Sequence, residues 1–365
     1  MTVPKSVRTA KEQWLRIVVF LAYLSTVLFL FSRHENWMDE AQAWLLAREL
    51  NFVQLVGQMK YEGHPCLWHL ILMPFAKLGF PYRTMNLISI ALVTIAAVLL
   101  LQKSPIPLTW QIPVLFGSAF LFYMPVVSRS YALIPPFMLL NALLYGKRHQ
   151  RPYAYGLSIA LLVQTHLFIL PFAGVLSLFW LFEALSGFRK SRDARWLLRQ
   201  AIGLSLPLAS LLLFLGQVSG AKVSSAYHFN WGGVFDWRYL LNSLNIYLFG
   251  FNQMECPSLL LARPRQTFAA ILFFLFAPVG ILFLRAWRKK DSESMKAAAI
   301  YTVSVAAQLM LAVLLARYAT QKTAILAFFA VWLLGPLAAA EDRQTNEAAG
   351  ADFIFGRGAV VFAAE

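Results

Sequence analysis

The chain has 365 residues, of which 59% are hydrophobic and 13% are charged, and its formal net charge is +15. Soluble domains carry about 25% charged residues, so the composition excludes an ordinary soluble protein and indicates a helical integral membrane protein. In such a protein excess Lys and Arg mark cytoplasmic loops, and we expect no nucleic-acid partner.

The N-terminus precedes an apolar stretch at 14–31 and carries Lys5, Arg8, Lys11 and Arg16. Positive charge favours the cytoplasmic side, so we predict a cytoplasmic N-terminus and a first span at 14–31. No small-residue cleavage site follows, so this span is expected to stay as an anchor. Three later basic clusters, at 147–151, 188–199 and 285–296, are assigned to the same side.

Four apolar segments lie between the first span and the 147–151 cluster, and four full spans would place that cluster on the wrong side. The segment at 65–79 is short and contains Pro65 and Pro74, so we place it at the outer interface as a helix that does not cross. The other predicted spans are 84–101, 108–127, 131–146, 153–168, 170–187, 201–218, 266–287, 297–315 and 322–339. The expected fold is an all-α polytopic membrane protein with about ten transmembrane helices and both termini cytoplasmic.

This layout divides the chain into four parts. Residues 1–218 form a transmembrane module that includes a first outer loop at 33–82. A second outer loop, rich in Trp, Tyr and Asn, covers 219–265. C-terminal helices cover 266–340, and a cytoplasmic tail covers 341–365. Both outer loops are expected to be interfacial and partly helical.

Polar side chains are concentrated in three places that this topology brings to the outer face. The first loop has Asp39, Glu40, Lys60, Glu62, His64 and His69. The sequence SRSYAL supplies Arg129 and Tyr131, and QTHLF supplies Gln164, Thr165 and His166. Ionisable residues at membrane depth are costly and indicate a functional site, so this convergence predicts one.

Each residue also has a purely structural interpretation. Asp39 would be a helix N-cap, with Gln42 three residues later completing a capping-box pattern, and Glu40 would be first-turn charge. Arg129 would be an anchor that extends to the interface, and Tyr131 would belong to an aromatic belt. His166 would be a hydrogen-bonded polar residue between two helices.

The ordered motifs WMDEAQAWLLARE, EGHPCLWHLIL, SRSYAL and QTHLFILP resemble the GT-C superfamily of membrane glycosyltransferases. The resemblance covers about residues 14–190 and is nearest to the branch of protein O-mannosyltransferases and lipid A aminoarabinose transferases. It implies a polyprenyl-phosphate-linked sugar donor, catalysis on the extracytoplasmic face and location in a bacterial inner membrane among membrane lipids. The HPP of many members is HPC here, with Cys66 replacing the second proline, and the chain is shorter than many members.

The resemblance places the catalytic base at Asp39, with Glu40 assisting or orienting the loop. Arg129 would bind the donor phosphate through its guanidinium fork, with Lys60, His64 and Tyr131 as further substrate-binding residues. A single displacement would invert the anomeric centre. Some relatives hold a divalent metal between a first-loop acid and a later His, which corresponds to Glu62 and His166, or His64, with Zn²⁺, Mn²⁺ or Mg²⁺.

Three other functions remain open at this stage. A transporter or flippase of lipid-linked substrates would have ionisable residues near the bilayer midplane and a two-fold repeat, and neither pattern is found in the sequence. A membrane O-acyltransferase would use a deep His, for which His166 is the candidate, but would leave the paired acids unexplained. A non-enzymatic scaffold would leave the predicted convergence without a purpose.

Overall fold

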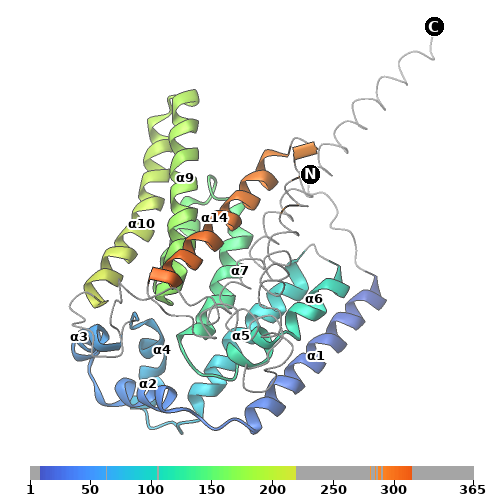
Figure 1. The fold of residues 1–365 in the computed structure, drawn as a ribbon, viewed down its shortest axis with the longest axis vertical. Coiled ribbons are helices and arrows are strands. Elements are labelled where there is room, and N and C mark those ends of the chain that lie inside the picture. The colour runs from blue at the N-terminus through green and yellow to red at the C-terminus, as the bar shows by residue number, and fades with distance from the viewer. Residues whose placement is uncertain are drawn as a thin grey trace.

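A computed structural model describes residues 9–62, 64–104, 107–218 and 291–314, together with Gly280, Leu284, Trp287 and Arg288. Within these ranges every regular element is helical (Figure 1), which confirms the all-α prediction. The predicted second outer loop, the span at 322–339 and the tail lie outside the described residues, as does the span at 266–287 apart from single positions.

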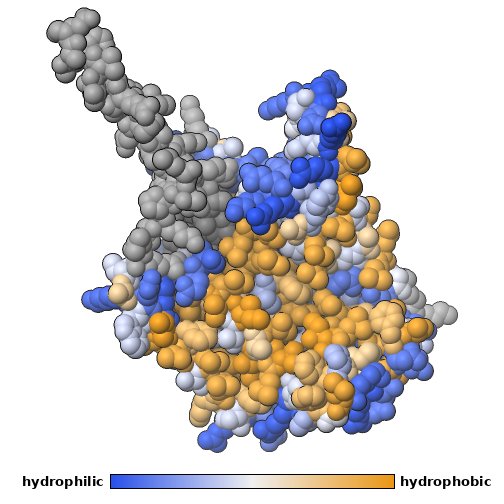
Figure 2. Space-filling view, turned by 180° about the vertical axis from the view of Figure 1, so that it is seen from behind, coloured by the Kyte–Doolittle hydropathy of each residue, from blue (hydrophilic) through white to orange (hydrophobic). Residues whose placement is uncertain are grey.

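Four helical segments in the described part are long and apolar enough to cross a membrane. They are α1 (Ala10–Ser32), α5 (Thr84–Lys103), the segment Leu167–Ser191 that contains α9 (Leu170–Ser191), and α10 (Ala194–Val218). Large apolar side chains lie exposed along them, including Trp14, Phe29 and Leu212. Figure 2 shows a broad apolar surface between polar regions at its upper and lower edges. Such a surface requires lipid rather than water, so the protein is embedded in a membrane.

The segment expected as one span at 108–127 is divided in the structure. The α6 helix (Leu108–Leu115) is followed by a short π-helix at Ala119–Tyr123. Pro113 removes a backbone donor inside α6, and Gly117 is a poor helix former. The next elements are a 3-10 turn at Ser130–Leu133 that leads into α7 (Ile134–Tyr145), then α8 (Pro152–Val163), and later α14 (Ser292–Leu314).

Three short helices form one end of the described bundle: α2 (Met38–Glu49), α3 (Phe52–Glu62) and α4 (Leu67–Lys77). Each has 11 or 12 residues. A helix of that length measures about 17 Å, too little to cross a hydrocarbon layer of about 30 Å. Figure 1 shows them far from the turn that joins α9 to α10. Helices therefore occupy much of the segment at 33–82, where the sequence predicts a partly helical loop.

The other end gathers the later basic clusters. Arg148 forms ion pairs with Glu183 of α9 at 2.7 Å and with Glu293 of α14 at 2.8 Å. Lys296 pairs with the same two carboxylates. The His149 ring lies 5.8 Å from that of Trp196 in α10. The described residues of these clusters that make the contacts, Arg148, Trp196 and Lys296, thus lie at one end of the bundle, an arrangement that the positive-inside rule favours.

Helices α8 and α10 approach each other closely at two glycines. A Cβ added to Gly156 would lie 2.0 Å from the carbonyl oxygen of Gly203, and one added to Gly203 would lie 2.7 Å from that of Pro152. Small residues allow helix backbones to come this near within a membrane. The contact fixes the N-terminal half of α10 against α8 and so helps to position the polar turn after Val163.

Candidate functional site

The start of α2 is capped by Glu40 and not by Asp39. Trp37 is the N-cap residue with extended backbone, and its N–H donates to Glu40 Oε2 at 2.8 Å. An acidic residue three positions after the N-cap can reach back in this way. The prediction that Asp39 is the N-cap, with Gln42 completing the box, is therefore wrong by two residues.

Glu40 joins two distant segments of the chain. Its side chain is fully buried, and Oε1 accepts the backbone N–H of Ser128 at 2.7 Å. His34 Nε2 lies 3.0 Å from Oε2. With both oxygens engaged and no exposed surface, Glu40 holds the start of α2 against the segment that contains Ser128. The expectation that Glu40 assists Asp39 or orients the loop stays a prediction.

Asp39 and Arg129 form the accessible part of the site. Arg129 Nη1 lies 2.5 Å from Asp39 Oδ2, and the two side chains are 23% and 46% exposed, respectively. The guanidinium carbon also lies 5.8 Å from the centre of the Tyr131 ring. The first-loop acid and SRSYAL motif, 90 residues apart, therefore meet at one end of the bundle. An exposed carboxylate beside a partly exposed guanidinium can bind both a proton and an anion.

Glu62 approaches the same pair from the end of α3. Gln42 donates from Nε2 to Glu62 Oε1 at 2.8 Å, which ties α3 to α2. Burial raises the pKa of Glu62, opposed by hydrogen bonds from Gln58 and Gln42 and by the charge of Arg129. The charge of Asp39 raises it further. Two carboxylates thus share one guanidinium in a partly buried place.

His64 and His69 form a stacked pair beside this group, with ring centres 5.4 Å apart. Burial, together with the charge of Arg129, lowers the pKa of His64 to about 4, and burial with the charges of His64 and Arg129 lowers the pKa of His69 to about 3. Both rings are therefore neutral near pH 7. His64 can hydrogen-bond a substrate, but it cannot hold a phosphate as a cation.

His166 lies behind Tyr131, with ring centres 4.9 Å apart, and both side chains are buried. His166 is also the N-cap of a short 3-10 turn, where its Nδ1 accepts the Phe168 N–H at 3.2 Å. Contacts run from Arg129 through Tyr131 to His166, and the charge of Arg129 also acts on Glu62. The structural interpretation of His166 as a hydrogen-bonded residue between elements accounts for this position.

The donor set does not fit a metal centre well. Across the part of the chain that the structure describes, no group of three or more His, Cys, Asp or Glu side chains could hold a metal ion. Glu62 and His166 gain no third such ligand there. Lys60 lies at the end of α3 with its ammonium 4.9 Å from the centre of the Tyr61 ring.

Comparisons of the chain with protein-family models, with curated proteins and with solved structures return no match. The contacts also identify a residue that sequence reasoning missed. His34 has a side chain only 4% exposed and binds the buried Glu40. Its position in the polar stretch RHEN, just before the acid pair, is the signal that could have indicated it.

Proposed function

We propose that the protein is an integral membrane glycosyltransferase. It would move a sugar from a polyprenyl-phosphate-linked donor to a lipid, glycan or protein acceptor at the extracytoplasmic face of a bacterial inner membrane. The ten-span topology, an interfacial first loop and two cytoplasmic termini belong to this proposal. The observation that supports it most directly is the exposed Asp39–Arg129 pair at one end of the bundle, opposite the end where the basic clusters meet.

The chemistry needs a base for the acceptor and an anion site for the leaving group. Asp39 takes the proton of the acceptor hydroxyl as its oxygen bonds to the anomeric carbon. The bond from that carbon to the phosphate oxygen breaks, and polyprenyl phosphate leaves as an anion, so the centre inverts through an oxocarbenium-like state. A positioned base contributes about 10²–10⁴-fold to the rate.

Arg129 has the geometry for the second task. The contact with Asp39 uses Nη1, and a guanidinium carries five N–H donors in a planar fork. In the proposed cycle the phosphate of the sugar donor binds the guanidinium of Arg129. Its arrival weakens the pairing with Asp39, and the carboxylate oxygen then becomes available to the acceptor hydroxyl. This order of events would limit activation of an acceptor before the donor is present.

Glu40 and His34 would hold Asp39 and Arg129 at a fixed position relative to each other. Glu40 accepts N–H groups from Trp37, two residues before Asp39, and from Ser128, directly before Arg129. A displacement of about 1 Å between catalytic groups can cost 10²-fold in rate. Tyr131 would orient the sugar or phosphate, and Lys60 and His64 would line the approach. Metal dependence stays a prediction, which transfer assays after chelation and re-addition of Zn²⁺, Mn²⁺ or Mg²⁺ would check.

A donor-binding assay on the purified full-length protein tests the proposal. The ligands are a polyprenyl-phosphate-linked sugar, free polyprenyl phosphate and a nucleotide sugar. We expect saturable binding of the lipid-linked sugar and of free polyprenyl phosphate, and no binding of the nucleotide sugar. Arg129→Ala should bind the two polyprenyl phosphates at least about tenfold more weakly, because it loses a charge-assisted hydrogen bond.

The matched control is Arg83→Ala, because Arg83 is an exposed arginine at the same end of the bundle. It should bind donor as the wild type does. Arg129→Lys separates the two interpretations of Arg129: an anchor tolerates Lys, whereas a bidentate phosphate site does not. Failure to bind any polyprenyl phosphate would remove the proposal and favour a transporter of another substrate.

A further inference from the structure

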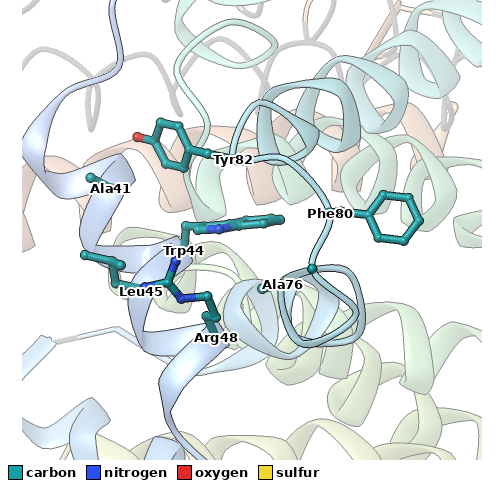
Figure 3. A pocket seen from close by; sticks show the side chains of 8 residues that line it. Ala41, Trp44, Leu45, Arg48, Ala76, Phe80 and Tyr82 are labelled. Atoms are coloured by element: carbon teal, nitrogen blue, oxygen red, sulfur yellow. The ribbon is translucent and has the colours of Figure 1, made fainter.

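A hollow of about 410 Å³ lies on the opposite side of α2 from Asp39. Ala41, Trp44, Leu45 and Arg48 line it at helical spacing, whereas Asp39 lies on another face of the helix. Residues three, four and seven apart share a face, so the hollow does not belong to the candidate catalytic site. Figure 3 shows the Trp44 ring between Tyr82 and Ala76, with Phe80 beyond it.

The far wall is fixed by the way α4 ends. Gly79 has φ of 80°, its N–H donates to the Ala76 carbonyl, and the Phe80 N–H donates to the Phe75 carbonyl at 3.1 Å. These two bonds define a Schellman cap. The Phe75 and Phe80 rings also meet edge to face at 5.7 Å, so Phe80 is held at the hollow by backbone geometry.

The near wall is equally well packed. Trp44 is 3% exposed and meets the Tyr82 ring edge to face at 6.3 Å. Both walls are therefore preformed, as is usual for ligand sites. The hollow is not a consequence of loose packing between α2 and α4.

The rim of the hollow combines apolar exposure with positive charge. Leu45, Leu78 and Phe80 are 45%, 75% and 48% exposed. The Arg48 side chain lines the hollow and is half exposed, and Lys77 Nζ donates to the Arg48 carbonyl at 3.3 Å. One exposed carboxylate, Glu49, pairs with Arg48, which leaves an excess of one positive charge among these three groups.

We propose that this hollow is a binding site for an anionic phospholipid. Arg48, with Lys77 beside it, would hold the headgroup phosphate, and the first part of an acyl chain would lie between Trp44 and Phe80 past Leu45. A phosphate matches the guanidinium fork, and apolar walls that open onto exposed Leu and Phe match a chain rather than a soluble anion. A lipid held there would brace the helix that carries Asp39.

Native mass spectrometry of the full-length protein tests the site without any transfer reaction. The probes are a phosphatidylglycerol and a phosphatidylcholine with identical chains, and inorganic phosphate as competitor. We expect about tenfold tighter retention of phosphatidylglycerol, lost in Arg48→Ala and reduced in Ala41→Phe, which fills the hollow and leaves its charge intact. Inorganic phosphate at millimolar concentration should not displace the lipid because it lacks the chain.

Lys103→Ala, at the opposite end of α5, is the matched control and should keep the preference. Three results would each overturn the proposal: equal retention of the two lipids, wild-type retention by both Arg48→Ala and Ala41→Phe, or displacement by phosphate alone. Because the readout is lipid retention, it is independent of sugar transfer. The lipid site can therefore stand if the glycosyltransferase proposal fails, and the reverse also holds.

Discussion

Ser128 donates its backbone N–H to the buried carboxylate of Glu40 at 2.7 Å. This bond connects residues 88 positions apart in the sequence. It fixes the segment that carries Arg129 against the helix that carries Asp39. The accessible Asp39–Arg129 pair is thus held in place by the buried contact between Glu40 and Ser128.

Replacing Glu40 by Gln should weaken the fold as well as the site. The amide puts an NH₂ group where the carboxylate now accepts backbone N–H groups from Trp37 and Ser128. A buried donor left without an acceptor costs about 1–3 kcal/mol. Thermal unfolding in detergent would measure the loss, with Glu35→Gln as an exposed neighbouring control. Equal midpoints for the two variants would show that Glu40 does not hold the segments together.

Asp39→Asn should abolish transfer without unfolding the protein. The side chain is 46% exposed and its contact is with the partly exposed Arg129, so an isosteric amide leaves the packing intact. Loss of the general base should reduce the transfer rate by at least about 10²-fold. Steady-state transfer would be compared with that of Glu49→Gln, an exposed acid on the same helix. Normal turnover in purified Asp39→Asn would exclude Asp39 as the base.

Acid should destabilise the packing of α3 and α4 through His64 and His69. Their folded-state pKa values are lowered from 6.5 to about 4 and about 3, so below pH 6.5 the unfolded chain binds more protons than the folded one. Stability is then complete above about pH 6.5 and falls as the pH drops toward 4. The loss would be measured as the melting temperature at several pH values between about 7 and about 4.5. The His69→Phe variant should show a smaller change in melting temperature with pH. A change equal to that of the wild type would count against the His69 contribution.

Arg148 is expected to be essential for stability at the other end of the bundle. Its side chain is 6% exposed and pairs with Glu183 and Glu293. Removing one partner of a buried ion pair costs about 3–5 kcal/mol because the remaining charge is left uncompensated. Arg148→Ala should lower the melting midpoint well below that of Arg151→Ala, an exposed arginine of the same cluster. Similar midpoints would indicate that water reaches the two carboxylates.

The sequence predicted the larger divisions of the fold because they depend on composition. Apolar runs and basic clusters are properties of local windows, so the first span, expected at 14–31, is found within α1 at Ala10–Ser32. The same reasoning brought the acid pair and SRSYAL to one end of the bundle. It could not foresee the break between α6 and the π-helix, because Pro113 and Gly117 are individually tolerated within apolar helices.

The contacts of the candidate site could not be predicted from short stretches of sequence, because they join residues that lie far apart in the chain. The N-cap at Trp37 was missed because Asp39 and Gln42 match the capping-box spacing as well as Trp37 and Glu40 do. The burial of Glu40 depends on Ser128, and His34 gained its role only through that buried carboxylate. Adjacent residues with similar side chains, Asp39 and Glu40, are thus separated into exposed and buried positions by tertiary packing alone.

The glycine contact between α8 and α10 has a consequence for biosynthesis. The α8 helix has 12 residues, about 18 Å, and is too short to settle across the hydrocarbon layer by itself. Its close partner, Gly203, is translated 47 residues after Gly156, when α9 has already been made. We therefore expect α8 to enter the lipid only after α10 has been made, with α8, α9 and α10 inserting as a single unit.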